Sequence, residues 1–135
     1  MASELRVNTL KDASGNNSVA MEYVANGSAK AWSNYNQTTP AVTGSFNVTS
    51  ISDDAIGKHT VNFTNNMADT TYAVATYVRR NTDSDNSGAY LGSNSTDTKT
   101  ASAMKFKTLY MDGGTAANGL TDYTENGHHF MGDLA

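Results

Sequence analysis

The residue run with the clearest capacity for chemistry is DSDNSG, at residues 83–88. Asp83, Asp85 and Ser87 alternate in a way that can place side-chain oxygens around a calcium ion, and the following glycine permits a sharp turn. A calcium loop then ends on a bidentate Glu six residues after the glycine, but Asn94 occupies that position. We interpret the run as a solvent-exposed turn without a metal, with a calcium ion as the alternative. No other cofactor is expected.

The three histidines, His59, His128 and His129, are the other candidate metal ligands. Adjacent residues of a strand point to opposite faces, so His128 and His129 cannot chelate one ion together. One histidine from each of three subunits is the alternative arrangement. We expect ordinary, half-exposed strand residues.

Several carboxylates of the chain are candidates for the acid and base residues of a glycoside hydrolase. Paired acids cleave glycosidic bonds, but Asp is also a common turn residue. The acids concerned are Asp53, Asp54, Asp112, Asp122 and Glu125. The sequence has no G-x-S-x-G, no phosphate-binding loop, no H-E-x-x-H and no cysteine. We therefore predict a protein that is not an enzyme and has no catalytic residues.

Three alternating apolar and polar runs must position these residues: FNVTSI (46–51), HTVNF (59–63) and TYAVATYV (71–78). Runs rich in Asp, Asn and Gly separate them, at 53–57 and 65–69. This pattern predicts three antiparallel strands joined by tight turns. Further strands are expected at 89–91, at 101–111 and in the C-terminal HHFMGDLA.

The N-terminal part alternates more weakly. Residues 3–10 and 18–24 are expected to be strands, and the Asn-Gly pair at 26–27 predicts a hairpin. Residues 37–44 are expected to be a linker. Trp32, the only tryptophan, is expected to be buried within one subunit or between subunits, with stacking on a ligand as a third alternative.

The composition predicts a β domain with a thin core. Leu, Ile, Val and Phe number only 20 of 135 residues, whereas Asn, Ser and Thr make up about a third. Such a domain can complete its buried surface by associating with copies of itself. The net charge of −4 and the lack of clustered Lys and Arg exclude nucleic acid as an expected partner. We also expect no membrane insertion and no signal peptide.

The central and terminal motifs resemble a β domain found in fibres and spikes of bacteriophages, especially marine ones. The similar residues are SFNVTSI (45–51), TVNF (60–63), the pair Met67 and Asp69, and the C-terminal F-M-G-D-L-A. His59 stands where that family often has Tyr. The resemblance implies a trimeric structural protein of the virion, made in the host cytoplasm.

We therefore predict an all-β, antiparallel β-sandwich, jelly-roll-like or immunoglobulin-like, with an N-terminal arm. The arm is expected over residues 1–36 and the sandwich over 45–135, assembled as a homotrimer. The predicted function is that of a short fibre or spike-type appendage of a bacteriophage virion. A capsid decoration or head-fibre protein and a carbohydrate-binding module are the alternatives.

The expected partners are other subunits, virion proteins of the tail or capsid, and a glycan or protein of the host surface. In a β-sandwich such contacts usually fall to loops, because the strands supply a rigid frame. The polar loops at 81–100 and 112–127 are the candidates. The contact residues we expect are Asp83, Asp85, Asn86, Asn94, Asn118 and Tyr123.

Overall fold

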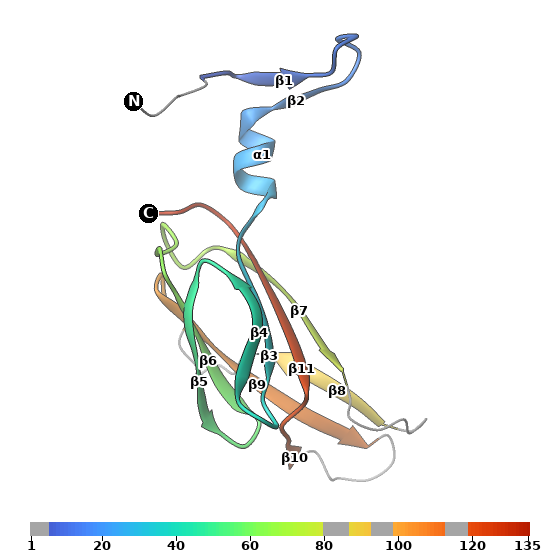
Figure 1. Cartoon of the computed structure of the whole chain (residues 1–135), viewed down its shortest axis with the longest axis vertical. Helices are drawn as coiled ribbons and strands as arrows, with labels where there is room; N and C mark the ends of the chain where they lie inside the picture. Colours follow the sequence, from blue (N-terminus) through green and yellow to red (C-terminus); the bar gives the residue numbers. More distant parts are fainter. Residues whose placement is uncertain (1–5, 80–86, 93–98, 113–118) are drawn as a thin grey trace.

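The computed structural model describes residues 6–79, 87–92, 99–112 and 119–135. The prediction of an all-β chain with antiparallel sheets is confirmed, because every pair of named strands is antiparallel. An N-terminal arm stands clear of a body made of two sheets (Figure 1). We call residues 29–135 the two-sheet body.

The elements of the chain fall into three groups. The arm contains β1 (Thr9–Lys11), β2 (Ser18–Ala20) and α1 (Met21–Gly27). A four-stranded sheet has the order β4 (Ala41–Phe46), β3 (Ala29–Asn36), β11 (Glu125–Met131) and β7 (Ala73–Arg79). A five-stranded sheet has the order β10 (Gly119–Leu120), β9 (Ala103–Asp112), β6 (Lys58–Phe63) and β5 (Val48–Ala55), and β8 (Ser87–Gly92) also pairs with β9.

The core lies between the two sheets, where alternate side chains of the central strands meet. Phe63 of β6 packs edge to face on Phe130 of β11, with ring centroids 4.8 Å apart. Val61 and Phe106 extend the same cluster from the five-stranded sheet. The alternation predicted within residues 59–63 and for Met104, Phe106 and Thr108 is confirmed. Val61, Phe63 and those three side chains are buried, whereas Asn62, on the opposite face, is not.

Two of the three predicted runs differ from the expected meander. Residues 46–51 are not one strand, because the chain leaves the four-stranded sheet after Phe46 and enters the other at Val48. β7 does not pair with β6 but crosses back to β11. In the segment between β6 and β7, Met67 is buried and forms an antiparallel backbone bridge with Leu134, which fixes the segment against the C-terminal end of the chain.

Asn47 is the single residue between the two sheets at this first crossing, and it holds the left-handed backbone conformation (φ 55°). Its side-chain Nδ2 donates to the carbonyl oxygens of Lys30 (3.0 Å) and Asn65 (3.1 Å). Its Oδ1 accepts from the backbone N–H of Asn65 at 2.8 Å. Asn tolerates positive φ better than other side chains because it can bond locally in this way.

The structure places the boundary of the arm earlier than predicted. β3 lies between β4 and β11 in the centre of a sheet, so the arm ends before Ala29 and not at residue 36. The expected linker at 37–44 is a turn followed by the first part of β4. Pro40 and the surrounding threonines are typical of turns, and this explains why the sequence pattern does not predict a strand here.

Residues 21–27 form a helix where we expected a strand and a hairpin turn. Met21, Glu22 and Ala25 are good helix formers, whereas the strand pattern rested on only three alternating side chains. Gly27 is the last residue of the helix, and Ser28 continues in an extended conformation into β3 instead of forming a hairpin turn.

Candidate functional site

The arm carries apolar side chains that stay largely exposed in the part of the chain that the structure describes. Leu10 and Val19 face each other across the β1–β2 ladder and remain 42% and 38% exposed. They line a shallow hollow of about 300 Å³ together with Lys11, Asp12, Asn17 and Ser18. Tyr23 and Val24 of α1 are also exposed. Figure 1 shows the arm projecting beyond the end of the body that carries the C-terminus.

The turn of the arm hairpin is organised by Asp12. Its Oδ2 accepts from the side chain of Asn17 at 2.7 Å, and its Oδ1 accepts from the backbone N–H of Asn16 at 3.0 Å. The hydrogen bond from Asn17 is the main cause that lowers the pKa of the Asp12 carboxyl. Gly15 (φ 72°) supplies the left-handed residue of this turn. The hairpin is therefore locally defined although it has no core.

Most of the residues predicted to contact a receptor or a metal lie outside the described residues: Asp83, Asp85, Asn86, Asn94 and Asn118. Ser87 begins β8. Tyr123 is the exception, and the structure places its side chain in the interior with 3% exposed. Its carbonyl oxygen accepts from Asn126 Nδ2 and from the backbone N–H of Gln37, both at 3.0 Å. It is an internal residue of the body and not a surface contact.

Two histidines form a buried pair that the sequence did not reveal. Nε2 of His59 and Nε2 of His128 are 2.9 Å apart, and Nδ1 of His128 is 3.0 Å from Ser33 Oγ. Both rings are fully buried, so the expectation of half-exposed strand residues is wrong for them, whereas His129 is exposed. A histidine bonded to another histidine inside one chain cannot also point to a threefold axis.

The environment of the pair favours the neutral, uncharged form of both histidine side chains. An Nε2–Nε2 hydrogen bond needs one ring to donate its proton and the other to accept through a lone pair. Burial lowers the pKa of His59 to about 4. Burial, and next the neighbouring His59, hold the pKa of His128 well below its usual range. Phe106 lies against both rings, with centroids 5.5 Å from His59 and 4.5 Å from His128.

Other polar groups surround the pair at the same end of the core. Thr108 Oγ1 donates to Gln37 Oε1 at 3.0 Å, and Asn126 Nδ2 donates to the carbonyl of Tyr35 at 3.2 Å. Burial raises the pKa of Tyr35 to about 12, with a further contribution from Asp53. This part of the core is polar, whereas Val61, Phe63 and Phe130 belong to an apolar cluster that Phe106 joins to the histidines.

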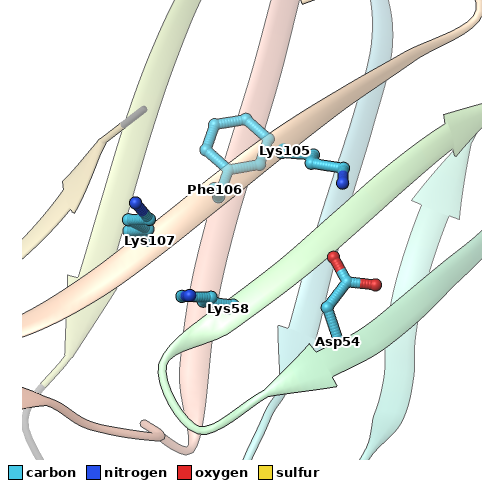
Figure 2. Close-up of a pocket in the computed structure, with 5 residues that line it drawn as sticks. All are labelled: Asp54, Lys58, Lys105, Phe106 and Lys107. Atoms are coloured by element: carbon cyan, nitrogen blue, oxygen red, sulfur yellow. The ribbon is translucent and has the colours of Figure 1, made fainter. Parts of the chain in front are cut away.

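A basic hollow lies on the outer side of the five-stranded sheet. Lys58, Lys105 and Lys107 surround a volume of about 140 Å³, with Phe106 and Asp54 completing its lining (Figure 2). Lys58 and Lys107 are cross-strand partners on β6 and β9, which explains their proximity. The carboxylate of Asp54 accepts from Thr60 Oγ1 at 2.5 Å. The hollow is a local cationic patch on a chain of net negative charge.

Two of the acids considered for hydrolysis, Asp122 and Glu125, make structural contacts. Asp122 Oδ1 accepts from the backbone N–H of Gly57 at 2.6 Å and holds the β5–β6 turn. Glu125 pairs with Arg79 at 3.1 Å. The pKa of Asp53 is raised, first by burial and then by the neighbouring Asp122.

Comparisons with known proteins do not assign the chain to a family. No family model matches it, and neither a curated protein nor a solved structure does so. Within the described ranges, three or more His, Asp or Glu side chains do not gather in a way that would hold a metal ion. In the same ranges, no helix has the length and apolar character needed to cross a membrane.

Proposed function

We propose that the protein is a structural component of a bacteriophage virion, a short appendage that the arm anchors in a larger assembly. The observation that carries this proposal is the exposed apolar face of the arm. An isolated two-stranded hairpin is marginally stable in water. Leu10 and Val19 therefore favour an arm that is covered by other subunits or by a virion partner. The resemblance of residues 45–51 and 60–63 to phage fibre domains supports the virion as the place of assembly.

A homotrimer is the assembly that we propose, because the resemblance implies threefold association. The small number of large aliphatic residues supports it, since a thin core gains from burial between subunits. The same anchoring would serve a capsid decoration or head-fibre protein. Co-purification with capsids that lack tails is the observation that would select this alternative.

A jelly-roll-like path fits the two-sheet body better than an immunoglobulin-like one. Its first and last strands, β3 and β11, lie side by side in one sheet. In immunoglobulin domains the first and last strands belong to different sheets. The eight longer strands of the body, β3 to β9 and β11, also match the strand number of a jelly roll.

The test is the oligomeric state of a full-length variant with a polar arm face, Leu10→Ser/Val19→Ser. We expect light scattering to show a trimer for the native chain and a monomer for the variant, because the apolar contact is lost. Ile56→Ser is the matched control, since Ile56 is 67% exposed on the body and lies outside the arm. A native monomer at micromolar concentration, or a variant that assembles as the native chain does, would contradict the proposal.

A further inference from the structure

The outer face of the four-stranded sheet carries a group of exposed aromatic side chains. The strand register places Phe46, Trp32, His129 and Ala75 in one row across β4, β3, β11 and β7. The next row contains Gly44, Asn34, Gly127 and Tyr77. Phe46, Trp32 and Tyr77 remain 55%, 37% and 52% exposed. Trp32 is therefore not buried within the subunit, which was the first of the expected alternatives.

The two glycines of the second row let the aromatic rings lie low over the sheet. A Cβ at Gly44 would be 3.3 Å from Cζ3 of Trp32, so the indole leans across β4 directly above that residue. A Cβ at Gly127 would be 3.5 Å from Cβ and 3.6 Å from Cδ1 of Tyr77. The glycines thus keep the centre of the face flat. Each ring is held against the backbone on one side and open to solvent on the other.

Neutral polar groups lie between the rings. Asn34 sits between Gly44 and Gly127 in the same row, and its Oδ1 would be 3.2 Å from a Cβ at Gly127. Within the described part of the chain its side-chain amide has no hydrogen-bond partner, so its donors and acceptor are open to a ligand. Arg79 and Glu125 form an ion pair at one rim of the face, at 3.1 Å, and Lys30, two residues before Trp32 on β3, donates from Nζ to Ser28 Oγ at 2.7 Å. The two rows themselves contain no Asp, Glu, Lys or Arg.

This combination fits a neutral saccharide. A sugar ring has an apolar C–H face that can stack on an aromatic ring and hydroxyl groups that bond to amide and imidazole groups. Trp32 on β3 and Tyr77 on β7 are separated by β11, a span of about two inter-strand spacings of 4.8 Å. That span suits an oligosaccharide better than a single ring. A contact between copies would instead favour a continuous apolar centre, which Asn34 and His129 interrupt.

We propose that the outer face of the four-stranded sheet binds a neutral oligosaccharide. Trp32 and Tyr77 stack on its sugar rings, and Asn34 and His129 bond to the hydroxyl groups between them. The biological role of this sugar-binding face rests on the proposed function, because a virion appendage with such a site would meet a glycan of the host surface. The binding itself requires only the two-sheet body.

The experiment uses the full chain on an array of neutral oligosaccharides of three to six hexose or N-acetylhexosamine units. The tightest ligand is then titrated while the emission of Trp32, the only tryptophan, is recorded. We expect a saturable change in emission. Followed by calorimetry, Trp32→Ala and Tyr77→Ala should each weaken binding at least tenfold, and Asn34→Ala several-fold. Trp32→Phe should retain part of the affinity. Tyr23→Ala on the arm is the matched control and should change nothing.

Three results would overturn the inference: no oligosaccharide of the array binds, binding survives Trp32→Ala and Tyr77→Ala, or Trp32 in the native assembly is shielded from acrylamide. The last result would identify the face as a contact between copies. The melting temperatures of the variants verify that each is folded. Leu10→Ser/Val19→Ser separates the two proposals, since it should abolish assembly and leave the sugar affinity of each subunit intact.

Discussion

At the scale of single residues, the buried pair of His59 and His128 is the most consequential feature. A polar group in a protein interior is tolerated when it is hydrogen-bonded, but a charged group is far more costly to bury. The pair meets the first condition at both Nε2 atoms, which are 2.9 Å apart, whereas Nδ1 of His59 has no partner among the described residues. A further proton on the accepting ring would set the two Nε2 groups donor to donor, and a further proton on the donating ring would place a charge in the interior.

We expect the free energy of unfolding to fall as the pH drops from 7 toward 4. The unfolded chain binds protons at both histidines near their ordinary pKa of 6.5, whereas the folded pKa is about 4 for His59 and well below 6.5 for His128. Each histidine then removes about 1.4 kcal/mol of stability per pH unit below 6.5. For His59 the loss reaches roughly 3 kcal/mol near pH 4. Urea unfolding at several pH values measures this slope.

Two variants separate the pair from other titrating groups. The double substitution His59→Phe/His128→Phe keeps aromatic rings beside Phe106 and should flatten the profile between pH 4.5 and 7. His129→Gln removes an exposed histidine of the same strand and should leave the slope unchanged. Parallel profiles for the native chain and the double variant would show that the buried pair is not the cause.

At the scale of elements, Asn47 joins the two sheets in a single residue. Asn47→Ala removes the bonds to Lys30 and Asn65 and leaves a left-handed backbone without a local partner. We expect a loss of about 4 kcal/mol, from the three hydrogen bonds described above, worth about 1 kcal/mol each, and about 1 kcal/mol of backbone strain. Chemical denaturation is the measurement.

Companion variants divide this loss into its two causes. Asn47→Gly should recover about 1 kcal/mol relative to Asn47→Ala, because glycine adopts positive φ without strain. Asn66→Ala, an exposed neighbour in the chain, should cost less than about 0.5 kcal/mol. Equal losses for the alanine and glycine variants would mean that the backbone conformation carries no cost.

The alternation of apolar side chains predicted individual strands better than their pairing. Val61, Phe63, Met104 and Phe106 were placed correctly because a period of two residues fixes which side chains share a face. The crossing at Asn47 was missed because alternation continues through it, from Phe46 to Val48, although the two residues belong to different sheets. The alternation of apolar and polar residues along the sequence does not indicate where the chain passes from one sheet to the other.

The candidate sites were less predictable for a related reason. His59 and His128 are 69 positions apart and were judged separately, so the pair became visible only through the pairing of β3, β6, β9 and β11. Trp32 was expected to be buried because large aromatic residues usually are. The one signal for its exposure was Gly44, whose missing side chain makes room for the indole.

At the scale of the whole molecule, the arm and the two-sheet body should behave as separable units. β3 lies between β4 and β11 and contributes Ala31 and Tyr35 to the interior. We expect a chain that begins at residue 29 to fold with a cooperative thermal transition and to remain monomeric. A chain that begins at residue 37 lacks the central strand and should not fold. Circular dichroism and light scattering measure both outcomes, and an assembled chain from residue 29 would show that the arm is dispensable.

The position of β3 also has a mechanical consequence. The arm joins the body at the first residue of β3, and the strands of the body run along its long axis (Figure 1). Ladder hydrogen bonds lie perpendicular to their strands. Tension between an anchored arm and the far end of the body therefore loads the bonds of β3 to β4 and β11 together, in shear, instead of breaking them one after another. A tether attached there can resist pulling forces that would peel an edge strand such as β4 or β7 from the same sheet.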